Sequence, residues 1–347
     1  MTLIDATVTP DTPSGPTPRN GADLWRRVLG YRPPQRYIPV LATAVVLITL
    51  YIFGRANYAR FGRPQVVLNI LIDNSFLFVV AAGMTFVILT GGIDLSVGSV
   101  IALTTVLSAT LIQAGWPAYA VLMIVLAIGT TLGLGMGSII HYFNIQPFIV
   151  TLAGLFLARG LTYSISTEAI PIRDPFWTFM SSERIRFGPR ASITLSVVIA
   201  AVVIGIGILV LAYTRLGRTT YAIGGNEQSA MLMGLPVART KVAVYGISGF
   251  CAALAGVMFT FYLPSGDPLH AVGLELDAIA AVVIGGTLLT GGSGYLVGTV
   301  LGVLTLGLIK TILNFQGNLT SWWLRIVVGL LLFAFILLQR LVVARRR

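Results

Sequence analysis

The stretch LTGGIDLSVGSV, residues 89–100, lies between two long apolar runs of the chain. It holds one aspartate, two serines and three glycines. Glycine lets a backbone bend and helices approach closely, and bent backbone at membrane depth must be buried in protein or face water. The stretch is therefore typical of an irregular segment beside a path through a helical membrane protein. Capping of the following helix by Asp94 or Ser96 explains the same residues and is compatible with such a path.

The composition supports a membrane protein built of helices. Hydrophobic residues make up 56% of the 347 and charged residues 10%. Apolar runs repeatedly exceed the roughly 20 residues that an α-helix needs to cross a bilayer. A soluble domain would carry more charge, and a β-barrel would alternate polar and apolar residues in short units. The sequence predicts an all-α, polytopic helix bundle.

Ten apolar runs are predicted to cross the membrane. Their ranges are 37–54, 66–90, 97–113, 118–140, 146–164, 192–213, 243–263, 272–290, 297–314 and 324–341. Residues 1–36 are predicted to be a disordered tail followed by a short interfacial helix, residues 37–341 the transmembrane domain, and residues 342–347 a basic C-terminus.

Arginines orient the predicted spans. They gather before the first span, in the loop 214–242 and after the last span, so the positive-inside rule places both termini and that loop in the cytoplasm. One loop does not follow the positive-inside rule: the span count places it outside the cell, although it carries Arg55, Arg60 and Arg63. The net charge of +11 is explained by this topology and does not indicate nucleic-acid binding. One cysteine and two scattered histidines predict neither a disulfide nor a metal cluster.

The opening stretch recurs later in the chain. Residues 90–103 read TGGIDLSVGSVIAL and residues 290–303 read TGGSGYLVGTVLGV, with six of fourteen positions identical. Glycine-interrupted segments at matching positions of two halves are common in transporters, so an internal repeat is predicted. The span count places both copies on the same side, which favours a parallel repeat. A segment that dips into the membrane and returns would permit an inverted one.

Three segments resemble a known family. They are GMTFVILTGGIDLSVGSVIAL (83–103), GRTTYAIGGNEQSAMLMGLPVARTK (217–241) and ELDAIAAVVIGGTLLTGGSGYLVGTVLG (275–302). In this order they resemble the permease subunits of bacterial ATP-binding-cassette (ABC) importers of ribose, xylose and galactose, and most of all a galactofuranose permease. The resemblance runs from about residue 60 to the end.

The resemblance implies a permease with about ten helices that imports a neutral monosaccharide through the bacterial inner membrane. Its implied partners are a second permease, identical or a sister, ABC ATPase subunits that hold ATP and Mg, and a periplasmic sugar-binding protein, with lipid around it and no nucleic acid. The sequence agrees that ATP chemistry lies elsewhere: it has no GxxxxGK[ST] loop, and its only lysines are Lys241 and Lys310. The chain itself is predicted to be neither an enzyme nor a cofactor protein.

The loop 214–242 is predicted to receive the ATPase. Asn226 is a plausible N-cap, EQSAMLM a short helix, and Gly234 with Leu235 and Pro236 a stop. The small residues Ser229, Ala230 and Gly234 resemble the small-residue positions of the coupling signature of import permeases. That signature has an acidic residue where this chain has Gln228, and Glu227 lies one position earlier. The predicted contact residues are Asn226, Glu227, Ser229, Ala230, Met231, Met233, Gly234 and Pro236. The alternative is a surface helix packed on its own bundle.

Polar residues inside the spans are candidates for the solute path. A charged side chain at the bilayer centre costs roughly 2.5–3.5 kcal/mol, so these residues face the bundle interior, an interface or a wet cavity. The predicted path residues are Asp73, Asn74, Ser75, Thr85, Asp94 and Ser96, with Glu275 and Asp277 at a possible external mouth. Hydrogen bonding between helices is the alternative. No basic cluster lines the spans, which favours a neutral solute.

Two other functions fit part of the sequence. A proton-coupled secondary transporter would use Asp73, Asp94, Glu275 or Asp277 as proton carriers. A membrane enzyme acting on lipid-linked sugars would need a cluster of acids and bases at an interface, and the sequence offers no convincing one.

Overall fold

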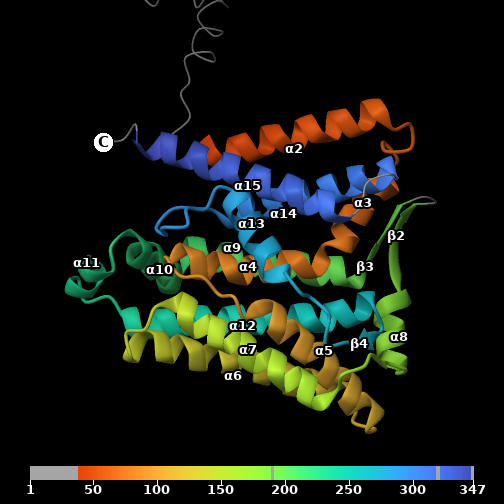
Figure 1. Ribbon diagram of the computed structural model, residues 1–347, viewed down its shortest axis with the longest axis horizontal. Coiled ribbons are helices and arrows are strands. Elements are labelled where there is room, and N and C mark those ends of the chain that lie inside the picture. The colour runs from red at the N-terminus through yellow and green to blue at the C-terminus, as the bar shows by residue number, and fades with distance from the viewer. Residues whose placement is uncertain (1–37, 189–190, 318–320, 345–347) are drawn as a thin grey trace, which may run out of the picture. The chain divides into compact units, whose positions relative to one another are not determined.

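The computed structural model describes residues 38–188, 191–317 and 321–344 (Figure 1). The tail and interfacial helix predicted for residues 1–36 lie outside the described residues, as do the last three positions. The elements below belong to the unit Arg36–Arg347.

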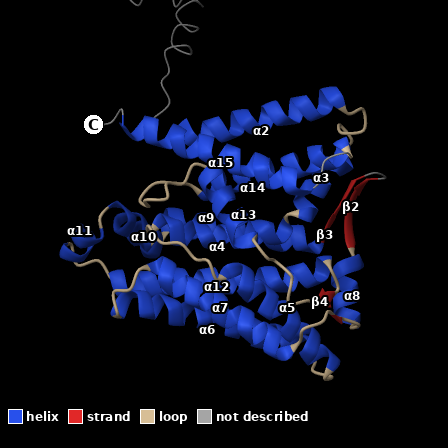
Figure 2. Ribbon diagram, viewed as in Figure 1, coloured by secondary structure: helices blue, strands red, loops and turns tan. Residues whose placement is uncertain are grey.

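Most of the described chain is helical (Figure 2). The helices are α2 (Ile38–Asn57), α3 (Pro64–Asp73), α4 (Ser75–Leu89), α5 (Val97–Gln113), α6 (Ala118–Tyr142), α7 (Pro147–Ile165), α8 (Pro175–Ser182), α9 (Leu195–Tyr213), α10 (Arg215–Gly225), α11 (Glu227–Leu232), α12 (Val237–Tyr262), α13 (Leu274–Ile284), α14 (Leu296–Gln316) and α15 (Ser321–Ala344). The strands are β1 (Ile170–Pro171), β2 (Arg184–Gly188), β3 (Ala191–Thr194) and β4 (Ser265–Gly266).

A helix occupies each of the ten predicted ranges, which confirms the all-α membrane fold. By length and composition, six helices of the described part are suited to cross a membrane, or seven if the bent pair α3–α4 is one span. Two of the others are short: α5 has 17 residues and fills its predicted range, whereas α13 has 11 and irregular chain takes the rest of 272–290. Helices of this kind, continued by irregular backbone inside a bundle, are common in transporters.

Helix α4 forms the centre of the bundle. All 15 of its residues are buried, because α9, α12, α13 and α14 surround it. Helix α12 packs in turn against α5 and α6. The α6–α12 contact is close: Gly129 and Gly133 lie one turn apart on α6, and a Cβ atom on either would overlap the α12 backbone. Small residues at such spacing let membrane helices pack backbone to backbone.

The two ends of the bundle differ. Helix α11 lies at one end and the strands lie at the other, here called the α11 end and the strand end (Figure 2). At the strand end β1 pairs with β4 and β2 pairs with β3, both antiparallel. An all-α fold predicts no strands; those present are short, and β2 is exposed along its whole length, so no alternating apolar pattern marks them.

The two copies of the predicted repeat touch each other. Residues 90–96 join α4 to α5, and residues 285–295 join α13 to α14. The Gly292 amide donates a hydrogen bond to the Leu89 carbonyl, with 2.9 Å between nitrogen and oxygen. The irregular part of the opening stretch, residues 90–96, is mostly packed within protein, with Gly91 exposed.

Candidate functional site

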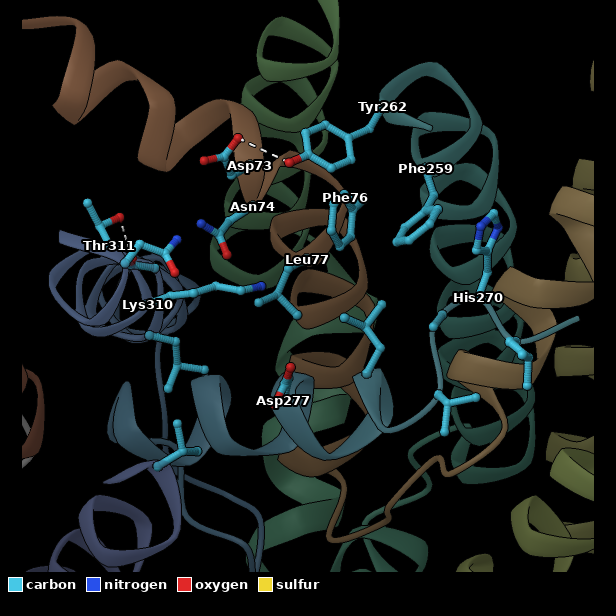
Figure 3. Close-up of a pocket in the computed structure, with 18 residues that line it drawn as sticks. Asp73, Asn74, Phe76, Leu77, Phe259, Tyr262, His270, Asp277, Lys310 and Thr311 are labelled. Carbon is cyan, nitrogen blue, oxygen red and sulfur yellow. Dashed lines mark hydrogen bonds between the residues drawn. The ribbon is translucent and has the colours of Figure 1, made fainter. Parts of the chain in front are cut away.

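A cavity of about 420 Å³ lies among α4, α12, α13 and α14, towards the strand end (Figure 3). It is lined by Asp73, Asn74, Phe76, Leu77, Phe259, Tyr262, Leu269, His270, Ala271, Val272, Leu274, Asp277, Leu306, Gly307, Lys310, Thr311, Asn314 and Val328. Its volume and its mixture of apolar walls with a few polar groups are those of a small-molecule site.

The break between α3 and α4 places the first acid in the cavity wall. The two helices meet at an angle of 53°, and Asn74 stands at the break. The Asn74 amide donates to the Ile70 carbonyl at 2.8 Å, which stabilises the last turn of α3. Asp73 is left exposed to the cavity, and the Tyr262 hydroxyl lies 3.4 Å from its carboxylate. A kink of this kind brings polar groups to a path without breaking a whole helix.

The other charged groups come from α13 and α14. Asp277 lies on α13, and Lys310 reaches from α14 towards Leu77, between the two carboxylates in the view of Figure 3. In the described part of the chain, no ion pair joins these three charged side chains to one another. They therefore retain hydrogen-bonding capacity for a polar solute.

Aromatic rings form a third side of the cavity. The Phe76 and Phe259 ring centroids are 4.8 Å apart, and the His270 ring lies 4.8 Å from Phe259. Burial lowers the pKa of His270, while the Asp267 carboxylate opposes this shift. The imidazole is consequently neutral at pH 7 and adds a flat surface without a charge.

Arg159 holds the segment that carries His270. The α7 side chain reaches residues 268–270, where its guanidinium donates to the Pro268 carbonyl and, at 3.1 Å, to the His270 carbonyl. These hydrogen bonds fix a wall of the cavity.

Towards the α11 end, the cavity is closed by a contact between α4 and α14. The hydroxyl oxygens of Thr85 on α4 and Thr299 on α14 are 2.9 Å apart and both side chains are buried. Eleven residues of helix separate Asn74 from Thr85, which corresponds to roughly 16 Å along the axis. Thr85 is therefore beneath the cavity and outside its lining.

Asp94 and Ser96 are also buried away from the cavity. The Asp94 carboxylate accepts hydrogen bonds from the Ser96 amide at 3.0 Å, the Ser96 hydroxyl at 2.6 Å and the Ser248 hydroxyl of α12 at 2.7 Å. The first two bonds stabilise the start of α5, and the third joins that start to α12. Neither Asp94 nor Ser96 accepts a side-chain hydrogen bond from an amide of α5, so Asp94 holds the residue before the helix and does not cap it.

Ser75 and Glu275 lie near the cavity but do not line it. Ser75, with Asp73, lines a smaller cavity of about 270 Å³ towards β3 and α8. Glu275 packs against Gly98, and its buried Oε2 has no hydrogen-bond partner among the described residues. Of the eight predicted path and mouth residues, the structure thus brings Asp73, Asn74 and Asp277 together around the main cavity.

The predicted coupling segment forms a separate feature at the α11 end. Asn226 caps α11 by accepting a hydrogen bond from the Ser229 amide at 2.8 Å, and Glu227 forms an ion pair with Lys241 at 2.6 Å. Ala230 is fully buried. Gly234 ends the helix with a φ of 73°, in the left-handed region where glycine is favoured, and Pro236 precedes α12.

Beyond the cap, α11 presents an apolar surface. Met231, Leu232 and Met233 are 53%, 90% and 67% exposed. Three adjacent apolar side chains with such exposure are suited to a groove on another protein. Leu232 is the most exposed of the three.

Several cavity residues escaped the sequence analysis. Phe76, Phe259 and Tyr262 are aromatic residues in apolar helices, a pattern that equally predicts ordinary packing. Segment 263–273 has no motif that indicates a wall. The one available signal was Lys310, a charged residue inside an apolar run.

Comparison with known proteins defines the class. Residues 66–336 match the family described as branched-chain amino acid transport system / permease component, and the chain belongs to this family. It is the permease subunit of an ABC importer, a multi-pass protein of the bacterial inner membrane. Permeases of this class are not enzymes, and they work with a separate ATPase and a substrate-binding protein.

Individual relatives cover most of the chain. The inner membrane ABC transporter permease protein YjfF of Escherichia coli is 47% identical over 88% of this chain and 93% of its own length. The fructose import permease protein FruG of Bifidobacterium longum is 43% identical over 91% of this chain and 94% of its own. The ribose import permease protein RbsC of Haemophilus influenzae is 41% identical over 78% and 84%. No solved structure matches the chain.

Proposed function

We propose that this permease imports a neutral monosaccharide, entering at the strand end from outside the cell and leaving at the α11 end into the cytoplasm. The observation that carries the proposal is the cavity, where aromatic rings face carboxylates, amides and one ammonium group. The apolar face of a sugar ring packs on aromatic side chains, while its hydroxyls hydrogen-bond to the polar groups. The named substrates of the fructose and ribose import relatives support the same class of solute.

The family description raises an amino acid as the competing solute. A zwitterion would need one acid and one base at fixed spacing, and the cavity has Asp73, Asp277 and Lys310. Two acids against one base, with three aromatic rings and two amides, suit several hydroxyls better than one carboxylate. Galactofuranose, the solute of the family that the sequence most resembles, belongs with ribose and fructose among the sugars to be tried.

The proposed path begins at the cavity and continues between α4 and α14, which are packed together in this structure and block it. Asp73, Asn74 and Ser75 lie at its outer part, with Glu275 and Asp277 at its mouth. Thr85, Asp94 and Ser96 lie deeper, and the solute reaches them once α4 separates from α14. The Thr85–Thr299 contact, at 2.9 Å, is the barrier that this movement opens. Weak, multiple contacts suit a subunit that must release its solute.

The proposed docking site for the ATPase is α11 with its exposed residues 231–233. Asn226, Glu227, Ser229 and Pro236 hold this segment in shape, Ala230 anchors it and Gly234 turns the chain back to α12. ATP and Mg belong to the ATPase. A second permease, identical or a sister, completes the proposed membrane unit in its lipid surroundings, with both termini in the cytoplasm.

Uptake by reconstituted complexes tests the solute class. The permease, its ATPase and its binding protein are placed in liposomes, and labelled ribose, fructose, allose, galactofuranose and leucine are offered separately. The proposal expects uptake of a sugar and none of leucine. Asp73→Asn and Asp277→Asn are expected to raise KM at least fivefold, with Asn57→Ala, exposed at the end of α2 and outside both cavities, as the control. Leucine uptake, or cavity variants with unchanged KM, would contradict the proposal.

A further inference from the structure

Three pairs of adjacent glycines meet at the α11 end of the bundle. Gly91–Gly92 follow α4, Gly224–Gly225 end α10, and Gly291–Gly292 lie between α13 and α14. The first and third pairs belong to the two copies of the repeat, and the second pair directly precedes the segment proposed to dock the ATPase. We call the contact of these three turns the glycine junction.

The junction is made of backbone against backbone. The Gly292 amide donates to the Leu89 carbonyl at 2.9 Å. A Cβ atom on Gly224 would overlap the Leu89 carbonyl oxygen and the Gly292 nitrogen, and one on Gly291 would lie 2.6 Å from the Gly91 nitrogen. Such contacts leave no flexible side chain to absorb a displacement, so a shift of one turn moves the others.

Helix α11 is attached firmly to this junction. Only Asn226 separates α10 from α11; its amide bonds back to the Ala222 carbonyl and its side chain caps α11. Ala230 of α11 packs with Ile223 of α10 in one buried apolar cluster. A force on the exposed face of α11 therefore reaches Gly224 through a short, well-packed segment.

A side-chain hydrogen bond strengthens the same connection. The Tyr221 hydroxyl of α10 donates to the Gly294 carbonyl at 2.9 Å, two residues beyond the third glycine pair. Helix α10 thus holds the turn between α13 and α14 from two positions. Those two helices carry Asp277 and Lys310 of the cavity, and α4 begins beside Asp73.

We infer that Gly224 is a positioning residue for transport: through the glycine junction it conveys the movement of α11 to both copies of the repeat at once. The movement separates α4 from α14 and so opens the Thr85–Thr299 contact. This inference rests on the proposed function, because it requires that a partner ATPase act on α11. The proposed function names a docking segment and a cavity; the inference adds the contacts that connect them. Neither the exposure nor the charge of Gly224 indicates such a role.

Neighbouring glycines supply a matched pair of variants. Gly224→Ala places a methyl group inside the junction, whereas a Cβ atom on Gly225 has no heavy atom within 4 Å. Both changes insert the same methyl group at the end of the same helix. The assay uses the whole complex in liposomes, with uptake of the sugar that the wild type imports and ATP hydrolysis with and without sugar-loaded binding protein.

The inference expects Gly224→Ala to bind the ATPase but to lose at least tenfold in uptake and to hydrolyse ATP without response to the binding protein. Gly225→Ala is expected to stay within twofold of wild type. Tyr221→Phe, which removes one hydroxyl and keeps the ring, is expected to lower uptake about threefold. Equal activity of the two alanine variants, whether both normal or both impaired, would overturn the inference.

Hydrogen–deuterium exchange of the wild-type complex covers the case in which Gly224→Ala fails to assemble. Trapping the ATPase with ATP and vanadate is expected to change amide exchange together in three segments, 87–93, 220–232 and 286–296. A change confined to 220–232 would overturn the inference. A wild-type complex that neither binds an ATPase nor imports a sugar would instead defeat the proposed function, so the two failures are distinguishable.

Discussion

Removal of the Asp94 carboxylate is predicted to destabilise the bundle strongly. This side chain accepts three hydrogen bonds, at 2.6, 2.7 and 3.0 Å, and is fully buried. Hydrogen bonds to a charged group contribute about 1.5–3 kcal/mol each, while burial of the carboxylate itself costs several kcal/mol. Asp94→Ala should therefore lower the free energy of unfolding by about 3 kcal/mol, most of it from buried donors left without an acceptor.

Two milder variants show how much each hydrogen bond of Asp94 contributes to the free energy of unfolding. Asp94→Asn keeps the shape and an accepting oxygen, and its amide group can donate to the Ser248 hydroxyl, so the expected loss is about 1 kcal/mol or less. Ser248→Ala removes one of the three bonds and should cost about 1–2 kcal/mol. Unfolding of the purified protein in mixed micelles titrated with dodecyl sulfate measures all three. An Asp94→Ala variant within 1 kcal/mol of wild type, or less affected than Ser248→Ala, would refute the reasoning.

Three further predictions concern the cavity wall, the docking segment and pH. Arg159→Gln should loosen residues 268–270 and raise the KM for sugar uptake about fivefold while kcat changes less than twofold, with partial recovery in Arg159→Lys; an unchanged KM would oppose that role. Leu232→Ser should abolish co-purification of the ATPase while the permease stays folded, whereas Gln228→Ala, an exposed polar residue of α11, should not; retained binding in Leu232→Ser would disprove docking at α11. Because burial lowers the pKa of His270 below its ordinary 6.5, its contribution to stability is present above pH 6.5 and is lost as pH falls below that value. His270→Gln should flatten this acid limb of the unfolding curve, and an identical pH profile in the variant would contradict the assignment.

The sequence predicted the elements of this fold well because membrane burial has a strong signature. Each of the ten spans predicted from continuous apolar runs contains a helix, and the capping pattern identified Asn226 and the short helix after it. Helix α10 was missed, since its polar residues 215–225 read as loop. The strands were missed because they are short and stand at the surface.

The site was harder to predict than the fold. Asp73, Asn74 and Asp277 were identified because charge and amide groups are costly within a span. The partners that define their surroundings lie far along the chain: Tyr262 contacts Asp73 across 189 positions, and Ser248 contacts Asp94 across 154. Pairing over such separations depends on how the helices pack, which one sequence does not show. The glycine repeat was visible, but only packing brings Gly224 against both of its copies.

The central claim is that this chain is a gate moved by a separate ATPase, and uptake in liposomes tests it most directly. Liposomes are prepared with the permease alone, and with the permease, its ATPase and its binding protein, each with and without internal ATP and a proton uncoupler. The account predicts that only the complete complex with ATP accumulates sugar and that the uncoupler leaves this accumulation unchanged. Accumulation by the permease alone, driven by a proton gradient and abolished by the uncoupler, would contradict it.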